Sequence, residues 1–366
     1  MVVNKKIRIA GIIAALAVSA IILSSPSQSP PLPEPITQPE NESIQILATN
    51  LQKPWAIAFA DGKIFVTEKQ GGIRIIESDT LIEEPLAALR VAKVFGGGLL
   101  GIATHPDFAN NHFLYVYYTY SEDDNLWNKV LRITEADNKI KDAITIIDKI
   151  PASQFYNGGV IKFGADNKLY VATGLSSEFS HESQDVSSLG GKILRLDDDG
   201  TIPTDNPFPD SSVFSLGHRD IQGMAWDKNG NLFVTEFGPT KNDEINLIRA
   251  GQNHGWPEVE CGGNEEFVDS IMCYDPSIEP GGIVFYSGDK LEYTGSLIMA
   301  TLRGSSLYKL DISENEVFSQ KSILSGVGRI RDVAQGPDDY LYVITSNTDG
   351  KGFPDKTDDK LIRILK

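Results

Sequence analysis

Residues 159–174 (GVIKFGADNKLYVATG) and 223–238 (GMAWDKNGNLFVTEFG) carry the pattern that decides the fold. Each reads as an apolar strand, a turn of Asp, Asn or Gly, and a second strand rich in aromatic and branched residues, which is typical of a β-hairpin. Weaker copies lie at residues 55–71, 100–119, 282–303 and 331–346. Because one hairpin cannot bury its own faces, the six copies must pack against one another.

The copies recur at a spacing that suits a blade of four short strands and a variable loop. Further alternating strands follow the hairpins, as at residues 72–76 (GIRII) and 191–196 (GKILRL). No ten-residue stretch after the first 42 residues has a convincing 3.6-residue period, so few helices are expected. The sequence therefore predicts an all-β, six-bladed β-propeller with four-stranded antiparallel blades. A two-sheet sandwich is the alternative.

Residues 43–50 (SIQILATN) precede the first copy of the repeat. We expect them to add a strand to the last blade, because a strand donated from the other end of the chain closes the ring and covers an open edge. The predicted propeller domain is thus residues 43–366.

The N-terminal segment has a different character from the rest of the chain. Lys5, Lys6 and Arg8 precede an apolar stretch at residues 9–23, so residues 1–25 are predicted to be a signal peptide or an N-terminal membrane anchor. A buried cytoplasmic helix is the alternative. Residues 26–42 are rich in proline and are predicted to be an extended linker. These features predict a protein that is secreted or anchored at the outer face of the cell membrane.

The charge and the cysteines narrow the possible partners and the redox environment. With 50 acidic and 33 basic residues the formal charge is −17, so a nucleic-acid partner is not expected without a local basic patch. The two cysteines, Cys261 and Cys273, are expected to form a disulfide in an exported protein. Two buried free thiols are the alternative.

Several segments beside the repeats go beyond a generic propeller. They include GGGLLGIATHPDF (residues 96–108), SLGHRDIQGMAWD (215–227), TEFGPTKNDEINLI (235–248), NHGWP (253–257) and GRIRDV (328–333). In this order, and from about Leu47 to the C-terminus, they resemble the glucose/sorbosone dehydrogenase family of soluble quinoprotein aldose sugar dehydrogenases. The resemblance implies a propeller that holds pyrroloquinoline quinone (PQQ) and Ca²⁺ over its channel. It also implies oxidation of an aldose to a lactone, with electrons passed to an external acceptor.

The resemblance assigns the binding of PQQ to four arginines and a serine. Arg219, Arg303, Arg329 and Arg331 match cofactor-facing basic positions of the family, and Ser277 matches a serine or threonine near the cofactor. The quinone carries three carboxylates, and guanidinium groups bind planar carboxylates through two parallel hydrogen bonds. Any one of these arginines could otherwise lie on a solvated strand face.

The same resemblance places calcium beside the quinone. Gly238 and Pro239 match the pair whose backbone carbonyls hold Ca²⁺ in the family, and calcium prefers oxygen ligands. Without the resemblance, a Gly-Pro pair indicates only a turn. Asp243, Glu244 and Asn246 could form a second, structural calcium site, or they could be polar loop residues.

Three positions depart from the family pattern. Tyr156 stands where the family has its general base, a histidine, and the ordinary pKa of tyrosine, about 10, is far less suited to that role than the value of about 6.5 for histidine. Gly96 replaces a Gln or Glu, and Asp220 replaces an Asn; both remain candidate substrate contacts. His181, in a long loop, is the one histidine that could replace the missing base.

Three functions are therefore compared. The first is an exported PQQ-dependent dehydrogenase with a small sugar as substrate, an external electron acceptor, and contact with the membrane only through the N-terminal segment. The second is a catalytically silent family member that acts as an extracytoplasmic binding propeller, because the expected histidine is Tyr156. The third is a calcium-dependent lactonase, whose central ring of acidic and Asn ligands the sequence does not visibly supply.

Overall fold

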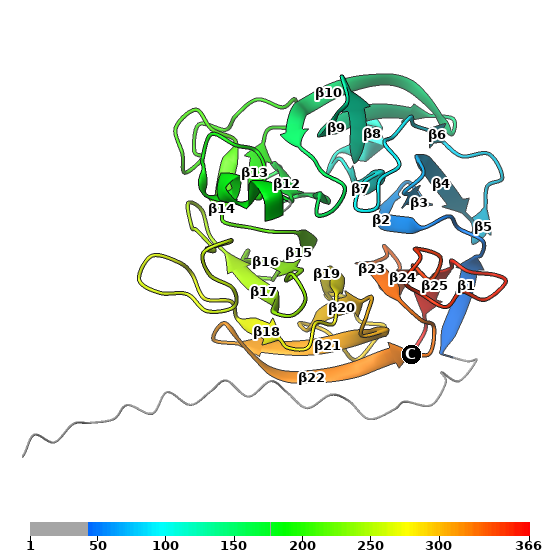
Figure 1. The fold of residues 1–366 in the computed structure, drawn as a ribbon. Helices are drawn as coiled ribbons and strands as arrows, with labels where there is room; N and C mark the ends of the chain where they lie inside the picture. Colours follow the sequence, from blue (N-terminus) through cyan, green and yellow to red (C-terminus); the bar gives the residue numbers. More distant parts are fainter. Residues whose placement is uncertain (1–42, 176) are drawn as a thin grey trace, which may run out of the picture.

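The computed structural model describes residues 43–175 and 177–366, so the predicted signal or anchor and the proline-rich linker lie outside the described residues. The described chain forms six antiparallel sheets arranged around one central axis (Figure 1). The prediction of a six-bladed β-propeller is confirmed.

The first three blades follow one another along the chain. The first contains β2 (Pro54–Ala60), β3 (Lys63–Glu68) and β4 (Gly72–Glu77), with the short strands β5 (Thr80–Leu81) and β6 (Ala87–Ala88) both paired to β4. The second contains β7 (Leu99–Thr104), β8 (Phe113–Glu122), β9 (Asn125–Ala136) and β10 (Lys139–Pro151). The third contains β11 (Gly158–Phe163), β12 (Leu169–Thr173), β13 (Lys192–Leu196) and β14 (Val213–Leu216).

The remaining blades complete the ring. The fourth contains β15 (Ile221–Trp226), β16 (Leu232–Glu236), β17 (Asp243–Ile248) and β18 (Met272–Tyr274). The fifth contains β19 (Pro280–Phe285), β20 (Leu297–Thr301), β21 (Ser306–Ser313) and β22 (Glu316–Ser325). The sixth joins β23 (Ile330–Gln335), β24 (Leu341–Thr345) and β25 (Leu361–Ile364) to the N-terminal strand β1 (Ile44–Ala48).

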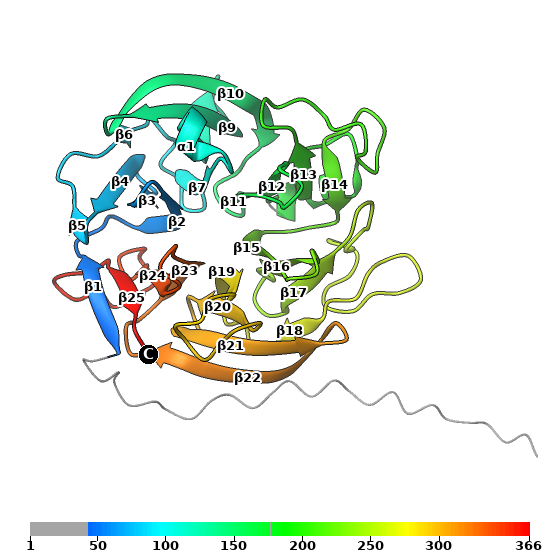
Figure 2. The ribbon, with the colours of Figure 1, turned by 180° about the vertical axis from the view of Figure 1, so that it is seen from behind.

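The ring is closed by strands from the two ends of the propeller. β1 pairs with β25 in antiparallel register, with Ile44 opposite Ile364 and Ala48 opposite Leu361, as expected from the sequence. The innermost strands β2, β7, β11, β15, β19 and β23 each contact the next, and β23 contacts β2 (Figures 1 and 2). Every blade is therefore held by two neighbours.

A buried threonine lies in the second strand of every blade. The second strand of each blade carries one fully buried threonine near its end or middle: Thr67, Thr119, Thr173, Thr235, Thr301 and Thr345. Two of these hydroxyls reach the next blade, because Thr67 Oγ1 donates to Leu100 O (2.6 Å) and Thr235 Oγ1 donates to Gly281 O (2.7 Å). The repeat thus encodes contacts between blades as well as hairpins.

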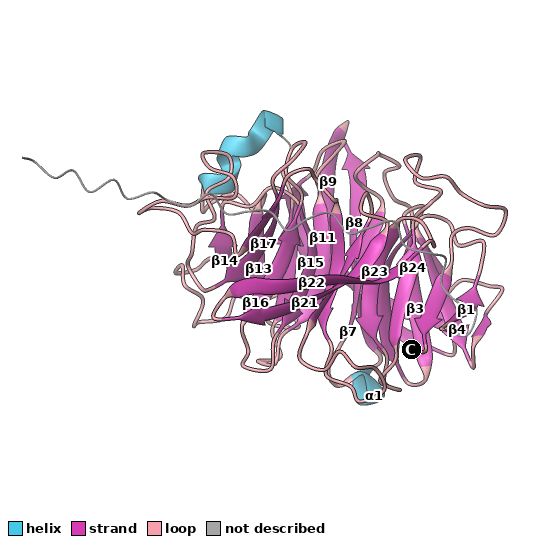
Figure 3. Ribbon diagram, turned by 90° about the horizontal axis from the view of Figure 1, so that it is seen from below, coloured by secondary structure: helices cyan, strands magenta, loops and turns pink. Residues whose placement is uncertain are grey.

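Only short helices interrupt the strands of the described chain. The α-helix α1 (Phe108–Asn111) and the 3₁₀ helix η1 (Ser177–Gln184) lie on opposite faces of the propeller (Figure 3). In the described chain, no helix combines the length and apolar character that crossing a membrane requires. Cys261 and Cys273 form a disulfide, so the first of the two alternatives for the cysteines holds.

The closing strand generates a prediction about stability. Leu47 is buried and Ile46, its neighbour in β1, is half exposed. Leu47→Ala is expected to lower the free energy of unfolding of the whole propeller by about 2–5 kcal/mol, the usual cost of removing a buried leucine side chain. Urea unfolding at neutral pH measures this change.

Ile46→Ala is the matched control and is expected to change the unfolding free energy by less than about 0.5 kcal/mol. Equal effects of the two substitutions would contradict the pairing of β1 with the last blade.

Candidate active site

One pocket lies at the mouth of the central channel, on the face of the propeller that carries η1. Blade by blade, its lining includes Trp55, Phe95, Tyr156, Asp220, Glu279 and Arg331, so every blade or the loop leading into it contributes. About 730 Å³ of the pocket, including its open mouth, is not filled by atoms.

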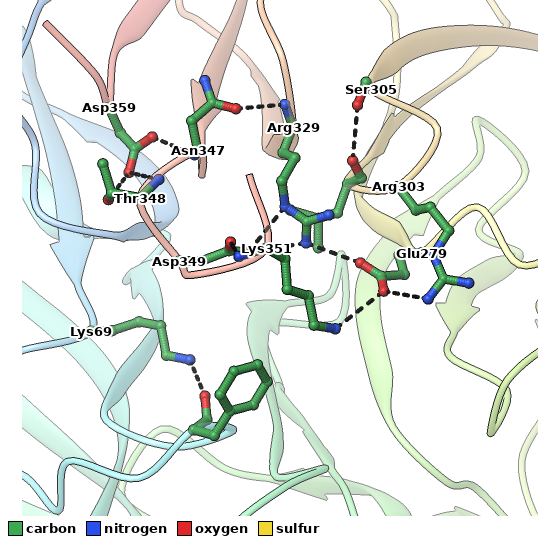
Figure 4. Close-up of polar contacts among 12 residues, drawn as sticks. Lys69, Glu279, Arg303, Ser305, Arg329, Asn347, Thr348, Asp349, Lys351 and Asp359 are labelled. Carbon is green, nitrogen blue, oxygen red and sulfur yellow. Dashed lines mark hydrogen bonds and ion pairs between the residues drawn. The ribbon is translucent and has the colours of Figure 1, made fainter. Parts of the chain in front are cut away.

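A carboxylate organises the cations on one side of this pocket (Figure 4). Glu279 accepts hydrogen bonds from Arg303 (3.0 Å), Arg329 (2.9 Å) and Lys351 (3.2 Å), and Arg329 also donates to Asp349 (3.0 Å). Burial by itself would raise the pKa of Glu279, but Lys351 and Arg329 more than offset this, and its pKa lies below the usual range. Glu279 therefore keeps its negative charge and fixes three cations, of which Arg329 and Lys351 line the pocket and Arg303 does not.

Arg331 differs from Arg329 because it forms no ion pair with a carboxylate in the described part of the chain. It is buried, its guanidinium lies 4.5 Å from the centre of the Trp55 ring, and Nη2 donates one long hydrogen bond to Gln222 O (3.3 Å). Its Nε has no partner within the described chain. Burial lowers the pKa of Arg331 to about 10, so it is charged at neutral pH. The pocket thus contains a buried cation with unused donors.

Lys69 is a further cation of the pocket, and the sequence analysis missed it. Its Nζ donates to Phe95 O (2.6 Å), and burial lowers its pKa to about 8. Lys351 lies 5.5 Å from the centre of the Phe95 ring, so the two lysines flank the pocket mouth. Lys69 directly follows the second strand of the first hairpin, and this position in the repeat is the signal that could have identified it as a pocket residue.

Arg219 lies behind this pocket. Its guanidinium is held between the rings of Tyr156 and Trp256, at 4.0 and 5.3 Å from their centres. Nη1 donates to the carbonyls of Phe237 and Gly238, both at 2.8 Å. A second, smaller pocket is lined by Arg219, Gly238 and Pro239. The structure therefore separates these predicted residues from Arg329 and Arg331.

The predicted calcium ligands do not form a metal site by themselves. Gly238 O already accepts a hydrogen bond from Arg219, and a cation beside that oxygen would be repelled by the guanidinium. Across residues 43–175 and 177–366, no group of three or more His, Cys, Asp or Glu side chains is placed to hold a metal ion. Calcium would need oxygens from a bound ligand and a movement of Arg219.

Asp243 connects the loop of Gly238 to the loop of Ser277. Its carboxylate accepts hydrogen bonds from Gly238 N (3.0 Å), Ser277 Oγ (2.7 Å), Ile278 N (2.8 Å) and Glu279 N (2.8 Å). These donors occupy the oxygens that a second calcium ion would use. Ser277 thus points to Asp243, outside the pocket lining, while Asp243 positions Glu279.

The other two residues of the suggested second calcium site are joined by a hydrogen bond. Glu244 accepts hydrogen bonds from Asn246 Nδ2 (2.9 Å) and from the backbone of Cys261 (2.6 Å). All three residues lie in strand β17, so they are not loop residues, and Asn246 Oδ1 has no hydrogen-bond partner in the described chain.

Gly96 and Tyr156 belong to one altered feature of the pocket mouth. A Cβ atom at Gly96 would lie 2.7 Å from Phe155 Cα, and Gly96 N donates to Gln154 O (2.7 Å). The loop before β11 therefore packs in the space that a larger residue at position 96 would need. Tyr156 has a left-handed backbone (φ 60°), and the half-exposed rings of Phe95 and Phe155 lie 5.4 Å apart at the mouth.

No histidine lies in the described lining of the central pocket. His218 is buried, with its ring nitrogens 2.8 Å from Ser215 Oγ and 3.1 Å from Glu236 Oε2, and burial lowers its pKa to about 3. His254 stacks on His218, with ring centres 4.8 Å apart. His181 is exposed on η1 and does not line the pocket. In the described chain, no histidine of the pocket lining can therefore take the place of the one expected at position 156.

The fold and this site define a class: a six-bladed β-propeller with a pocket over its channel that is lined by several cations. The model of the family described as Glucose / Sorbosone dehydrogenase matches residues 51–363, and the chain belongs to that family.

Named relatives agree with this assignment. The chain is 30% identical to the aldose sugar dehydrogenase YliI of Escherichia coli, over 86% of this chain and 92% of that protein. It is 36% identical to the PQQ-bound form of an aldose sugar dehydrogenase from Streptomyces coelicolor, with a TM-score of 0.81 over 88% of this chain and 98% of that chain. It is also 28% identical to the mouse Hedgehog-interacting protein, over 51% of this chain and 32% of that protein.

The role of Glu279 generates a prediction. Glu279→Gln is expected to lower the free energy of unfolding at pH 7 by about 1–3 kcal/mol, because it leaves the buried Arg329 without one of its two charged partners. Since the pKa of Glu279 is depressed in the folded state, the difference is fully present above about pH 4.3 and is lost as the pH falls through the folded-state pKa. Urea unfolding at pH 7 and at pH 3 measures it.

Glu84→Gln, at an exposed glutamate without an ion pair in the described chain, serves as the control. A loss at pH 7 that persists undiminished at pH 3 would show that packing, and not charge, is the contribution of Glu279.

Proposed function

We propose that this protein catalyses the PQQ- and calcium-dependent oxidation of aldose sugars to lactones and passes the electrons to an external acceptor. The single observation that carries the proposal is Arg331, a buried guanidinium with an unpartnered Nε, facing a pocket that all six blades line. A buried guanidinium with unused donors is a place where an anionic ligand can bind, because the ligand would satisfy those donors.

The donor set of the pocket fits a planar ligand with several carboxylates. Arg331 and Lys69 form no ion pair with a carboxylate in the described chain, while Glu279 fixes Arg329 and Lys351. These four residues would hold the carboxylates of PQQ, with the ring of Trp55 beside Arg331. When bound, PQQ supplies the two-electron oxidant that the reaction requires.

Calcium dependence is part of the proposal. The carbonyl oxygens of Gly238 and Pro239 would complete a calcium site together with oxygens of the bound cofactor. Arg219 would then release Gly238 O and keep its hydrogen bond to Phe237 O. Support comes from the proximity of the two pockets, which share Phe237 in their linings.

The mouth of the pocket suits a sugar. Phe95 and Phe155 present half-exposed rings on which the C–H face of a pyranose can pack, and Tyr156 and Asp220 supply polar groups at the inner side. Gly96 makes no side-chain contact with a sugar, and its missing side chain leaves space for the backbone of Phe155. Tyr156 occupies the position of the general base in the proposed reaction.

We propose an extracytoplasmic location, secreted or anchored at the outer face of the cell membrane, with residues 1–25 as signal peptide or anchor and residues 26–42 as linker. The sequence of residues 5–23, in which basic residues precede an apolar stretch, supports this location. A sugar and an external electron acceptor are the proposed partners, and nucleic acid is not.

A catalytically silent binding propeller is the second candidate. Two observations favour it: Tyr156 replaces the expected base, and its ring is held against Arg219. The chain also shares part of its length with a relative that is named for an interaction and not for a reaction.

The arginine of the pocket generates a prediction on binding. Arg331→Ala is expected to weaken the binding of PQQ at least about tenfold, or about 1.4 kcal/mol, because it removes a buried guanidinium with unused donors. Quenching of tryptophan fluorescence during a PQQ titration measures the dissociation constant, because Trp55 lies beside Arg331. Arg249→Ala, at an exposed position after β17, is the control and should leave the constant unchanged.

Reconstitution tests the function itself. The purified protein is incubated with PQQ and Ca²⁺, and the reduction of a dye is followed with a panel of aldoses. We expect dye reduction that disappears when calcium is removed with a chelator and returns when calcium is added. Tight binding of PQQ without dye reduction at any pH would favour the binding propeller, and failure to bind PQQ would reject the cofactor assignment.

A further inference from the structure

Asp220 is the acidic side chain of the pocket that no ion pair engages within the described chain. It lies in the loop between β14 and β15, is almost fully buried, and lines the central pocket together with Tyr156 and Gly158. Its Oδ1 accepts a hydrogen bond from Gly158 N (3.0 Å), which is the one hydrogen bond of this carboxylate in the described structure. The second oxygen is left for a ligand in the pocket.

The backbone fixes Asp220 on both sides. Its carbonyl accepts a hydrogen bond from Phe237 N (3.1 Å), and Gly158 lies at the start of β11. Gly158 has a positive φ of 59°, and a Cβ atom there would lie 2.6 Å from Gly174 N, so the donor N–H is presented by tightly packed backbone. The carboxylate is therefore positioned by two rigid strand ends.

The surroundings of Asp220 make it a stronger base than an ordinary aspartate. Burial raises its pKa to about 6, against the opposing effects of Arg219, the Gly158 N–H and Arg331, and Glu236 raises it further. Lys69 and Tyr117 also face this charge. At neutral pH the group is ionised, and a pKa close to the working pH is the condition under which general-base catalysis is most effective.

The other candidate bases are less suited. The ring of Tyr156 is packed on the guanidinium of Arg219, with the ring centre 4.0 Å from it. Lys69 donates to Phe95 O, and its pKa of about 8 leaves it mainly protonated at neutral pH. As described above, the histidines lie outside the pocket lining. Among these candidates, the Asp220 carboxylate is the ionised group that remains as a general base.

We propose that the carboxylate of Asp220, and not the hydroxyl of Tyr156, accepts the proton of the sugar's anomeric hydroxyl in the oxidation reaction. This inference rests on the proposed function. The C1–H bond of the sugar breaks and its electron pair leaves with the hydrogen to the bound quinone, which is reduced. The O–H proton moves to Asp220, the C1=O bond of the lactone forms, and the proton later passes from Asp220 to water. Two chain positions that depart together from the family pattern, Tyr156 and Asp220, thereby have one explanation.

Asp220→Asn tests the proposal, because it keeps the shape of the side chain and its acceptor for Gly158 N–H while removing the basic oxygen. With the reconstituted enzyme and its best aldose, kcat is expected to fall at least about 100-fold. The dissociation constant of PQQ should stay within about threefold of the wild-type value or decrease. Tyr156→Phe is compared with it, and Asp210→Asn, at an exposed aspartate outside the pocket lining, should keep kcat within about threefold. Asp220→Ala should also be inactive and should regain turnover with added formate, which a purely structural role would not produce.

The protein without cofactor gives an independent measurement. Because the pKa of Asp220 is higher in the folded state than in the unfolded chain, ionisation of this group destabilises the fold between about pH 4 and pH 6. The Tm of Asp220→Asn relative to wild type should therefore rise across that interval and remain constant above it. Asp210→Asn, at an exposed aspartate, should show no such trend.

Each result decides between the proposals. Turnover by both the wild type and Asp220→Asn would overturn the assignment of the base while keeping the proposed function. Loss of turnover in Tyr156→Phe but not in Asp220→Asn would have the same meaning. A wild-type protein that binds PQQ and never reduces the dye would overturn both. A Tm difference that does not change between pH 4 and pH 6 would show that Asp220 is an ordinary carboxylate and would also overturn the assignment.

Discussion

The antiparallel pairing of β1 with β25 is the constraint on which the rest of the structure depends. It joins Ile44–Ala48 to Leu361–Ile364 and so converts a row of blades into a closed ring. A side-chain contact then joins this last blade to the first, because Asp332 Oδ2 accepts a hydrogen bond from Ile57 N (2.9 Å). Since the pocket takes its lining from all six blades, an open ring would have no pocket. Arg331 lies in β23, the innermost strand of the closing blade, and its position is fixed only when that blade is held from both sides.

Within the ring, electrostatics divides the cations of the pocket into two groups. Glu279 and Asp349 fix Arg329, and Glu279 also holds Arg303 and Lys351. Arg331 has no such partner in the described chain, although the protein as a whole is strongly acidic. Asp332, Asp220 and Asp349 favour the charge of Arg331 without pairing with it, so its unused donors are left for a ligand. The same burial acts in opposite directions on the acids and bases nearby, because it raises the pKa of Asp220 and lowers that of Lys69.

The three positions that the sequence analysis interprets as departures from the family pattern are neighbours in space. Gly96 gives room to the backbone of Phe155, whose loop carries Tyr156 into the pocket, and Asp220 lies beside the same loop through its hydrogen bond to Gly158. A change at one of these positions alters the space or the charge available to the others. We therefore interpret Gly96, Tyr156 and Asp220 together, as one wall of the pocket.

The sequence by itself determined the number and type of the blades, because strand alternation and turn residues are local properties that repeat along the chain. It also placed Arg329, Arg331, Tyr156 and Asp220 near the pocket, through motifs beside the repeats. It did not find Lys69, Lys351 or Glu279, and it did not separate Arg219 from the pocket or turn Ser277 towards Asp243. Those outcomes depend on distances between blades that lie far apart in the sequence, as in the 50-residue separation of Glu279 from Arg329. Only the closed tertiary structure decides which charges meet, how deeply they are buried and which one is left for a ligand.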